Sequence, residues 1–145
     1  MRAVAFAATL LIAASALAGF TPEQEKQLAD ATYVYVQSER KSGEWSTPAE
    51  IWFFVDGGKL YVGTRPSSWR VKRINAGRTK ARIAIGKVDG PAVEATGALV
   101  KDAALQGRMM AAYATKYPDG WKKYEQSFRE GFETGERVLV AYTPR

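Results

Sequence analysis

The residues best suited to chemistry lie in one short segment, Ser67 to Arg73, which combines two hydroxyl groups with three cations. Ser67 or Ser68 is expected to cap a short helix, with Arg70 in its first turn and Arg73 one turn later. Helix N-termini favour anions, and guanidinium groups form paired hydrogen bonds with phosphate oxygens. The segment therefore predicts a site for one phosphate group.

The chain around this segment is basic. Between Gly57 and Val88 every charged side chain is a Lys or an Arg, and the whole chain carries a net charge of +6. Such a stretch can simply be a solvated surface. It can also attract any polyanion, and Trp69 and Tyr61 could serve as stacking platforms for nucleic acid. An exported protein meets little nucleic acid, so that partner is not expected here.

The sequence contains no His and no Cys. This absence excludes Ser-His-Asp and Cys-His nucleophiles, thiolate or imidazole zinc sites, proximal-His haem, iron–sulfur clusters and disulfides. No acidic cluster has the spacing of a calcium loop, so no metal site is expected. Neither G-x-G-x-x-G nor a Walker sequence occurs. Chemistry must therefore come from a bound cofactor, or from Lys, Arg, Tyr, Ser, Thr and carboxylates.

The N-terminus has the pattern of a secretory signal. Arg2 is the only charged residue before Glu23, and the apolar run from Ala3 to Ala18 ends in a small-x-small triplet. A membrane anchor is the alternative, but this run is shorter than the roughly 17–25 residues that span a bilayer. We expect residues 1–18 to be cleaved, so that residues 19–145 are exported to the periplasm or secreted, without a stable membrane anchor.

The elements that must position the phosphate site are short. Thr21-Pro22-Glu23-Gln24 predicts a helix start, and Asp102 is expected to cap a longer helix that ends near Tyr117. Pro118-Asp119-Gly120 is expected to break that helix, with a short helix over residues 121–128 after it. Period-two alternation or β-branched and aromatic residues predict six strands, over residues 33–36, 50–55, 60–64, 81–85, 92–100 and 137–142.

These strands are joined by turns of hairpin length, such as Asp56-Gly57-Gly58. The long crossovers that a parallel sheet requires are missing. The sequence therefore predicts a mainly β fold with short helices (α+β), in which residues 19–145 form one six-stranded antiparallel barrel.

Two stretches of this chain are similar to a known family. The segment Ile51 to Thr64, followed by Ser68-x-Arg70-Val71-Lys72-Arg73-Ile74, resembles the pyridoxamine 5'-phosphate oxidase-like family. The closest similarity is to its small split-barrel members, which bind flavin mononucleotide (FMN) or the deazaflavin coenzyme. Lys116-Tyr117 also resembles a pair that follows the long helix in many of those chains. The resemblance implies a six-stranded split barrel, usually a two-fold homodimer with cofactors at the interface.

The resemblance also implies particular site residues. The phosphate of the cofactor would be held by Thr64, Ser68 and Arg70, with Lys72 or Arg73 in support. Ser67 is added as the second hydroxyl of the segment described above, not from the resemblance. Arg70 stands where the family commonly has Lys, which keeps the charge and changes the geometry. The residues that would contact the cofactor ring are Ile51, Trp52, Phe53, Ala84 and Ile85.

The implied activity is that of a flavin-dependent oxidoreductase on a small substrate, with FMN or the deazaflavin carrying the hydride. No side chain is an evident general acid, and Tyr35, Tyr61 and Tyr113 are candidates only by elimination, so the catalytic residues remain unassigned. The alternative is a non-catalytic module that binds a phosphorylated or other anionic small molecule. Haem is disfavoured, because without His or Cys only Tyr remains as an axial ligand.

Overall fold

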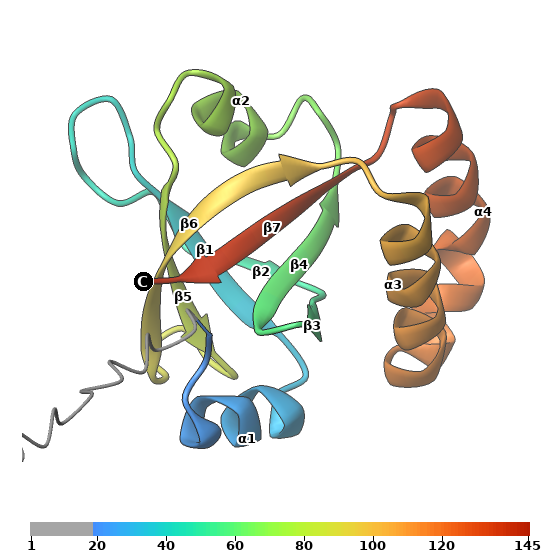
Figure 1. The fold of residues 1–145 in the computed structure, drawn as a ribbon, viewed down its shortest axis with the longest axis horizontal. Helices are drawn as coiled ribbons and strands as arrows, with labels where there is room; N and C mark the ends of the chain where they lie inside the picture. Colours follow the sequence, from blue (N-terminus) through green and yellow to red (C-terminus); the bar gives the residue numbers. More distant parts are fainter. Residues whose placement is uncertain (1–18) are drawn as a thin grey trace, which may run out of the picture.

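Seven strands and four helices make up the described part of the chain, residues 19–145, in the computed structural model (Figure 1). The expected secretory signal, residues 1–18, lies outside the described residues. In chain order the elements are α1 (Pro22–Asp30), β1 (Val34–Ser38), β2 (Ala49–Ile51), β3 (Phe54–Asp56), β4 (Lys59–Thr64), α2 (Trp69–Asn75), β5 (Lys80–Ile85), β6 (Ala92–Val100), α3 (Ala103–Lys116), α4 (Pro118–Thr134) and β7 (Val138–Pro144).

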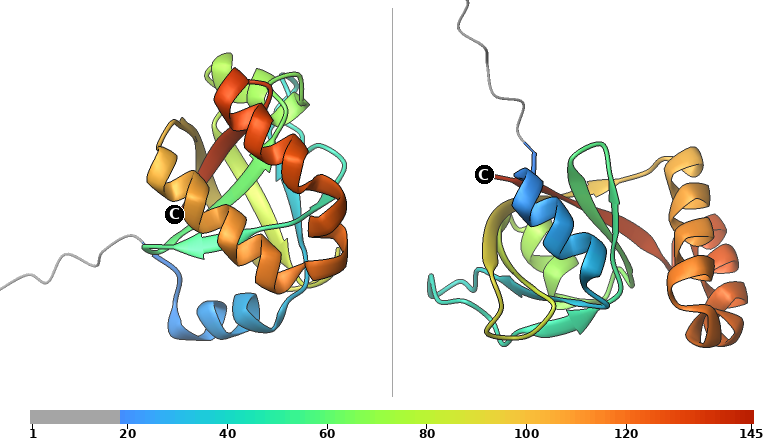
Figure 2. Two further views of the ribbon diagram at one scale, coloured as in Figure 1. Left: turned by 90° about the vertical axis from the view of Figure 1, so that its right-hand side faces the viewer. Right: turned by 90° about the horizontal axis from the view of Figure 1, so that it is seen from below.

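The strands form one curled sheet in the order β2-β1-β5-β6-β7-β4-β3, and every neighbouring pair is antiparallel. Figures 1 and 2 show the sheet wrapping around its own interior, with α3 and α4 together on one side. The predicted antiparallel barrel with short helices is therefore confirmed.

The strand number differs from the predicted six for one local reason. The segment expected as a single strand over residues 50–55 divides into β2 and β3, which lie at opposite edges of the sheet. Ile51 pairs with Val34 of β1, whereas Phe54 pairs with Tyr61 of β4. Since no neighbouring strand accompanies the whole segment, its ladder is interrupted where the chain passes from one edge to the other.

Two hydrophobic clusters lie on the two faces of the sheet. The barrel core fills the interior and includes Leu60 and Val62 of β4. The helix-side core lies between the sheet and helices α3 and α4, and it includes Tyr61 of the same strand. Because successive residues of a strand point to opposite faces, β4 contributes to both clusters and is covered on both sides.

The starts of α1 and α3 follow the predicted capping chemistry. The Thr21 hydroxyl accepts from the backbone N–H of Gln24 at 3.2 Å, and the Gln24 side chain accepts from the Thr21 N–H at 2.9 Å. Asp102 likewise accepts from the Leu105 N–H at 3.0 Å. These contacts satisfy N–H groups that a helix start would otherwise leave unpaired.

The second half of the helical pair is longer than expected. As expected, the longer helix α3 ends just before Pro118, at Lys116; Pro118 itself starts α4, ahead of the expected residue 121, at a position where its missing N–H is no loss. The buried stripe of α3 runs through Leu105, Met109 and Tyr113, at a spacing of four residues. No helix among residues 19–145 combines the length and the apolar character needed to cross a bilayer.

One glycine allows the helices to approach the sheet closely. A Cβ atom at Gly63 of β4 would lie 2.7 Å from the Phe128 ring of α4 and 3.3 Å from the Met109 side chain of α3. Contacts that short do not occur between ordinary side chains, so only glycine fits at this point. The close approach sets the position of α3 and α4 beside the C-terminal end of β4.

Candidate functional site

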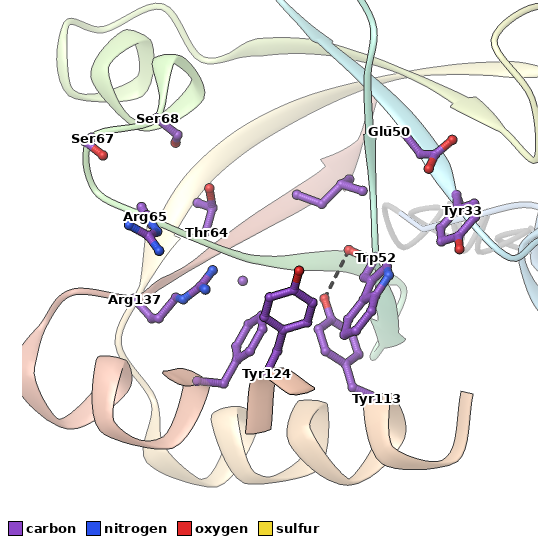
Figure 3. Close-up of a pocket in the computed structure, with 13 residues that line it drawn as sticks. Tyr33, Glu50, Trp52, Thr64, Arg65, Ser67, Ser68, Tyr113, Tyr124 and Arg137 are labelled. Atoms are coloured by element: carbon purple, nitrogen blue, oxygen red, sulfur yellow. Dashed lines mark hydrogen bonds between the residues drawn. The ribbon is translucent and has the colours of Figure 1, made fainter. Parts of the chain in front are cut away.

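A cavity of about 530 Å³ lies between the end of β4, the β2–β3 connection and the helices α3 and α4 (Figure 3). We call it the aromatic cavity. Its volume falls in the range of about 300–1,000 Å³ that small-molecule sites occupy. The residues that line it are Tyr33, Glu50, Ile51, Trp52, Gly63, Thr64, Arg65, Ser67, Ser68, Tyr113, Tyr124, Phe128 and Arg137.

Two arginines form one end of the aromatic cavity, and the strand register brings them together. Thr64, the last residue of β4, pairs with Val138, the first residue of β7. In an antiparallel pair the next position along one strand faces the preceding position on the other, so Arg65 comes opposite Arg137. Figure 3 shows both guanidinium groups on the same side of the cavity. Like charges placed opposite each other are unfavourable unless an anion joins them.

Arg137 is held in place by its surroundings. Its guanidinium lies over the Phe128 ring, 4.4 Å from the centroid, and its Nη2 donates to the Ser127 hydroxyl at 3.3 Å. Burial lowers the pKa of Arg137, and the neighbouring Arg65 lowers it further. Neither arginine belongs to the salt bridges found among residues 19–145, which are Arg108–Asp56 and Arg129–Glu125. The pair is therefore a cationic end without an acidic partner.

Hydroxyl groups surround this cationic end. Thr64 is buried, and Ser67 and Ser68 follow in the loop that leads into α2. Ser68 occupies the N-cap position of α2, as predicted, but its hydroxyl makes no capping hydrogen bond. The Ser68 Oγ atom is buried and has no hydrogen-bond partner. A buried hydroxyl without a partner is costly, and a bound acceptor would satisfy it.

Aromatic side chains form the wall next to the arginines. The Trp52 ring stacks on Tyr117 with 4.5 Å between the centroids and 8° between the planes. Tyr113 and Tyr124 meet the same indole edge-on, at 5.5 Å and 5.9 Å. Offset stacked and edge-on rings are the favoured geometries of aromatic pairs, so this wall is preorganised.

Two buried tyrosine hydroxyls fix the β2–β3 connection. Tyr113 donates to the Trp52 carbonyl at 3.0 Å, and Tyr117 donates to the Thr32 carbonyl at 2.7 Å. The Tyr117 oxygen also accepts from the Phe53 N–H at 3.2 Å. Burial raises the pKa of Tyr113 and raises the pKa of Tyr117 to about 12. Both groups therefore keep their protons at neutral pH and act as hydrogen-bond donors.

The opposite end of the aromatic cavity carries an acid. Glu50 lies there with Tyr33, as Figure 3 shows, and its Oε2 accepts from the Tyr35 hydroxyl at 2.7 Å. The cavity is thus cationic at one end and acidic at the other. Across the described chain, no three His, Cys, Asp or Glu side chains gather to hold a metal ion.

Only some of the residues predicted to contact the cofactor ring line the aromatic cavity. Ile51 and Trp52 line the aromatic cavity. Phe53 and Ile85 belong to the barrel core, and Lys116 Nζ lies 3.5 Å from the centroid of the Phe53 ring. Ala84 is buried on β5, opposite Tyr35 of β1. These last three residues do not line the cavity within this single chain.

The residues predicted to bind the phosphate are distributed over two neighbouring cavities. Thr64, Ser67 and Ser68 line the aromatic cavity, whereas Arg70 and Arg73 line a neighbouring cavity that shares Ser68 with it. Lys72 is exposed, with its Nζ 4.9 Å from the centroid of the Trp69 ring. The cations at the end of the aromatic cavity are Arg65 and Arg137 instead.

The sequence pattern did not indicate several lining residues. Arg137, Tyr124 and Phe128 come from the end of the chain, far from Thr64 in sequence. Of the three tyrosines considered as acids, Tyr113 alone lines the cavity. No local motif marks Arg137, since its role depends on the pairing of β4 with β7. That pairing is a long-range feature.

Comparisons with known proteins place the fold. No protein-family model and no curated protein matches the sequence. Among solved structures, a protein described as a pyridoxamine 5'-phosphate oxidase from Listeria innocua has a TM-score of 0.61 and 14% identity, covering 85% of this chain and 91% of that one. An F420 reductase has a TM-score of 0.55 and 18% identity, covering 83% and 92%. The heme storage protein HutZ from Vibrio cholerae has a TM-score of 0.58 and 11% identity, and the match covers 88% of this chain and 91% of that one.

At these levels of identity the similarity defines the fold. The chain is a split barrel of the pyridoxamine 5'-phosphate oxidase-like type, as its sequence predicted. Proteins that share a fold differ in what they bind and catalyse, so function has to be argued from the cavity itself.

Proposed function

We propose that the aromatic cavity binds a flavin-type cofactor that carries a phosphate, either FMN or the deazaflavin coenzyme. The observation that carries this proposal is the pairing of Arg65 with Arg137 at one end of a cavity whose wall is aromatic. A phosphate group matches the two guanidinium groups, and a flat ring system matches the stacked side chains. The fold, shared with an F420 reductase, supports the same class of ligand.

The residues present fit such a group. Arg65, Arg137 and the Thr64 hydroxyl would hold the phosphate, and the unpartnered Ser68 Oγ would gain the partner it lacks. Trp52 would lie against the ring, since Tyr117 and Tyr113 already fix its indole. When bound, the cofactor supplies hydride transfer, and the chain supplies binding, orientation and exclusion of water.

We further propose that the protein acts as an oxidoreductase on a small substrate. The acidic end of the cavity offers Glu50 to that substrate, as a hydrogen-bond acceptor that Tyr35 orients. A second candidate function is non-catalytic binding of a phosphorylated small molecule. It is favoured by one observation: the Tyr113 hydroxyl, the candidate acid that lines the cavity, already donates its proton to the Trp52 carbonyl and does not direct it at a substrate.

Thermal unfolding of residues 19–145 with and without FMN tests the cofactor. At a ligand concentration 100 times the dissociation constant, binding to the native state adds about 2.7 kcal/mol of stability. We expect Arg137→Gln and Arg65→Gln each to remove most of this shift. Arg129→Gln is the matched control, because it removes an equally charged side chain from the exposed face of α4. The deazaflavin coenzyme is assayed in the same way.

A shift that survives both substitutions would contradict the proposed phosphate site, and no shift with either cofactor would contradict the cofactor class. Reduction of the bound cofactor by a chemical donor, followed by reoxidation with candidate acceptors, separates an oxidoreductase from a binding module. A cofactor that binds and never cycles would favour the non-catalytic function.

We also propose that the protein is exported and forms a homodimer. The N-terminal pattern of residues 1–18 supports export, and the family resemblance supports the dimer. N-terminal sequencing of protein recovered outside the cytoplasm should begin near Gly19. Light scattering after size-exclusion chromatography should give twice the mass of residues 19–145. An uncleaved N-terminus or a monomer would contradict these two proposals.

A further inference from the structure

The acidic end of the aromatic cavity is built on the outer face of β1 and β2. Glu50 of β2 lies directly opposite Tyr35 of β1 in the antiparallel register. Tyr33 precedes Tyr35 by two positions, so both tyrosines point to the same face of the sheet as Glu50. Figure 3 shows Glu50 and Tyr33 on the side of the cavity away from Arg65 and Arg137. A carboxylate and an aromatic ring therefore share this end.

The Glu50 carboxylate is oriented by a hydrogen bond and has no cationic partner among residues 19–145. Its Oε2 accepts from the Tyr35 hydroxyl at 2.7 Å. Glu50 belongs to neither of the salt bridges in that part of the chain, although the sequence has 21 Lys and Arg against 15 Asp and Glu. It is also the single acid among the residues that line the aromatic cavity. One negative charge is thus available to a ligand here.

Three parallel aromatic rings lie beside this acidic end. Tyr33 is stacked on Tyr117 with 6.1 Å between the centroids and 4° between the planes, and Trp52 is stacked on Tyr117 at 4.5 Å and 8°. The faces of aromatic rings carry partial negative charge and attract cations. Tyr33 and Trp52 are partly exposed and line the cavity. The stack therefore adds an electron-rich surface to the charge of Glu50.

A glycine of α4 fixes the position of the Trp52 indole. A Cβ atom at Gly120 would lie 2.6 Å from Cζ2 and 2.8 Å from Cη2 of the indole, closer than real Cβ atoms approach other atoms. The six-membered ring of Trp52 therefore rests on the helix at a point where only glycine leaves room. Tyr117 stacks on the indole, and Tyr113 and Tyr124 meet it edge-on. A surface held in this way binds a ligand without first having to be ordered.

We propose that the acidic end of the aromatic cavity selects a positively charged organic substrate, whose quaternary or protonated nitrogen is recognised by the Glu50 carboxylate and by the faces of Tyr33 and Trp52. Carboxylates pair with such cations, and aromatic faces attract them. A neutral molecule of the same shape gains neither interaction. This inference rests on the proposed oxidoreductase function, since it names the class of substrate, but binding of the cation itself requires no cofactor.

Two probes that differ in one atom test the preference for charge. Choline and neohexyl alcohol have the same shape, but a carbon atom of the alcohol replaces the quaternary nitrogen of choline. Both are titrated calorimetrically into residues 19–145 at low ionic strength, where charge interactions are least screened. Choline is expected to bind about tenfold more tightly, because it gains a carboxylate and aromatic faces. Equal affinities, or no measurable binding of choline, would overturn the proposal.

Substitutions locate this preference in the cavity. Glu50→Gln removes the charge at an exposed position and keeps an oxygen that can accept from Tyr35, and it should abolish most of the tenfold preference for choline. Glu94→Gln is the matched control, because Glu94 is an exposed acid of β6 that does not line the cavity. Tyr33→Leu should weaken choline about threefold and leave neohexyl alcohol nearly unchanged. An equal loss in Glu94→Gln would reduce the effect to general charge attraction and overturn the site.

A further measurement separates this inference from the proposed cofactor. Arg137→Gln, which should remove most of the FMN-induced thermal shift, should not reduce the preference for choline, since Arg137 lies at the other end of the cavity. The preference should also persist in the FMN-loaded protein, and competition between FMN and choline would overturn the proposed substrate position. If neither FMN nor the deazaflavin coenzyme binds while the preference that depends on Glu50 persists, the cofactor proposal fails and the cation site stands.

Discussion

The two hydrophobic cores of this protein lie on opposite faces of the same strands and differ in composition. The barrel core is mostly aliphatic, and its fully buried members include Val34, Leu60 and Val62. The helix-side core is mostly aromatic, and Tyr113 and Phe128 from α3 and α4 lie at its centre. Strands β4 and β7 supply alternate residues to both cores.

This difference in composition suggests that the barrel core mainly stabilises the fold, whereas the helix-side core also shapes the ligand site. Branched aliphatic side chains adapt to each other and fill the inside of a small barrel. Aromatic rings are rigid and meet in fixed orientations, and their hydroxyl groups need partners when buried. Tyr113 and Phe128 therefore pack in the helix-side core and also line the aromatic cavity. Substitutions in the two cores should consequently have different effects on stability and on ligand binding.

The largest effect on stability is expected in the barrel core. Leu60→Ala removes a side chain with no solvent exposure, and we expect a loss of about 2–5 kcal/mol in the free energy of unfolding. Urea denaturation measures the loss. Under native conditions the FMN-induced stabilisation should be unchanged, because Leu60 does not line the aromatic cavity. A lost ligand shift in a folded Leu60→Ala protein would break the distinction between the cores.

The contact between β4 and the helices should affect both properties. Gly63→Ala places a Cβ atom 2.7 Å from the Phe128 ring, so α4 must move away from the sheet. We expect a loss of about 1–3 kcal/mol, together with weaker ligand binding, measured by urea denaturation and by titration. Gly107→Ala is the control, since Gly107 is an exposed position of α3 at which a Cβ meets nothing within 4 Å. It should stabilise by about 0.5–1 kcal/mol.

A smaller effect is expected from a single hydroxyl. Tyr117→Phe removes the donor to the Thr32 carbonyl and the acceptor for the buried Phe53 N–H. We expect a loss of about 1–2 kcal/mol, because the Phe53 N–H is left without a partner. Tyr124→Phe is the control and should change unfolding by less than about 0.5 kcal/mol, since Tyr124 is 40% exposed. Equal losses in the two variants would contradict the hydrogen-bond explanation.

The smallest effect concerns pH and appears only in alkaline solution. The pKa values of Tyr113 and Tyr117 are raised by burial in the folded state, that of Tyr117 to about 12 from an ordinary value of 10. Above pH 10 the unfolded chain releases these protons while the folded chain retains them, so stability should fall as pH rises. Urea denaturation between pH 8 and 11 measures the slope, which should be shallower in Tyr117→Phe. An unchanged slope would contradict this assignment.

How far the sequence predicted the fold can be seen at particular elements. The capping residues Thr21 and Asp102 act as expected, because capping depends on residues three positions apart. The segment around Trp52 was expected as one strand, since its composition alone cannot show that the chain changes neighbours there. Pro118 ends α3 as expected, but it also starts α4 at once, because Pro is accepted at the first helical position.

The candidate site was predicted only in part, because sequence patterns identify residues that are close to each other along the chain. Thr64, Ser67 and Ser68 lie together because they are close in sequence and lead into α2. Arg70 and Arg73 follow in the same segment, yet the rotation of the helix directs them to a different cavity. The local sequence thus identified the polar loop, but it did not show which arginine lines which cavity.

By itself the sequence determined the antiparallel barrel, the caps of α1 and α3 and the basic polar loop after β4, since each depends on alternation, turns or spacing within a few residues. Only the tertiary structure decided that Arg137 faces Arg65 and that Trp52 is stacked on Tyr117. The physical reason is that strand register and helix docking follow from the packing of distant side chains. Local sequence does not specify which distant surfaces fit each other.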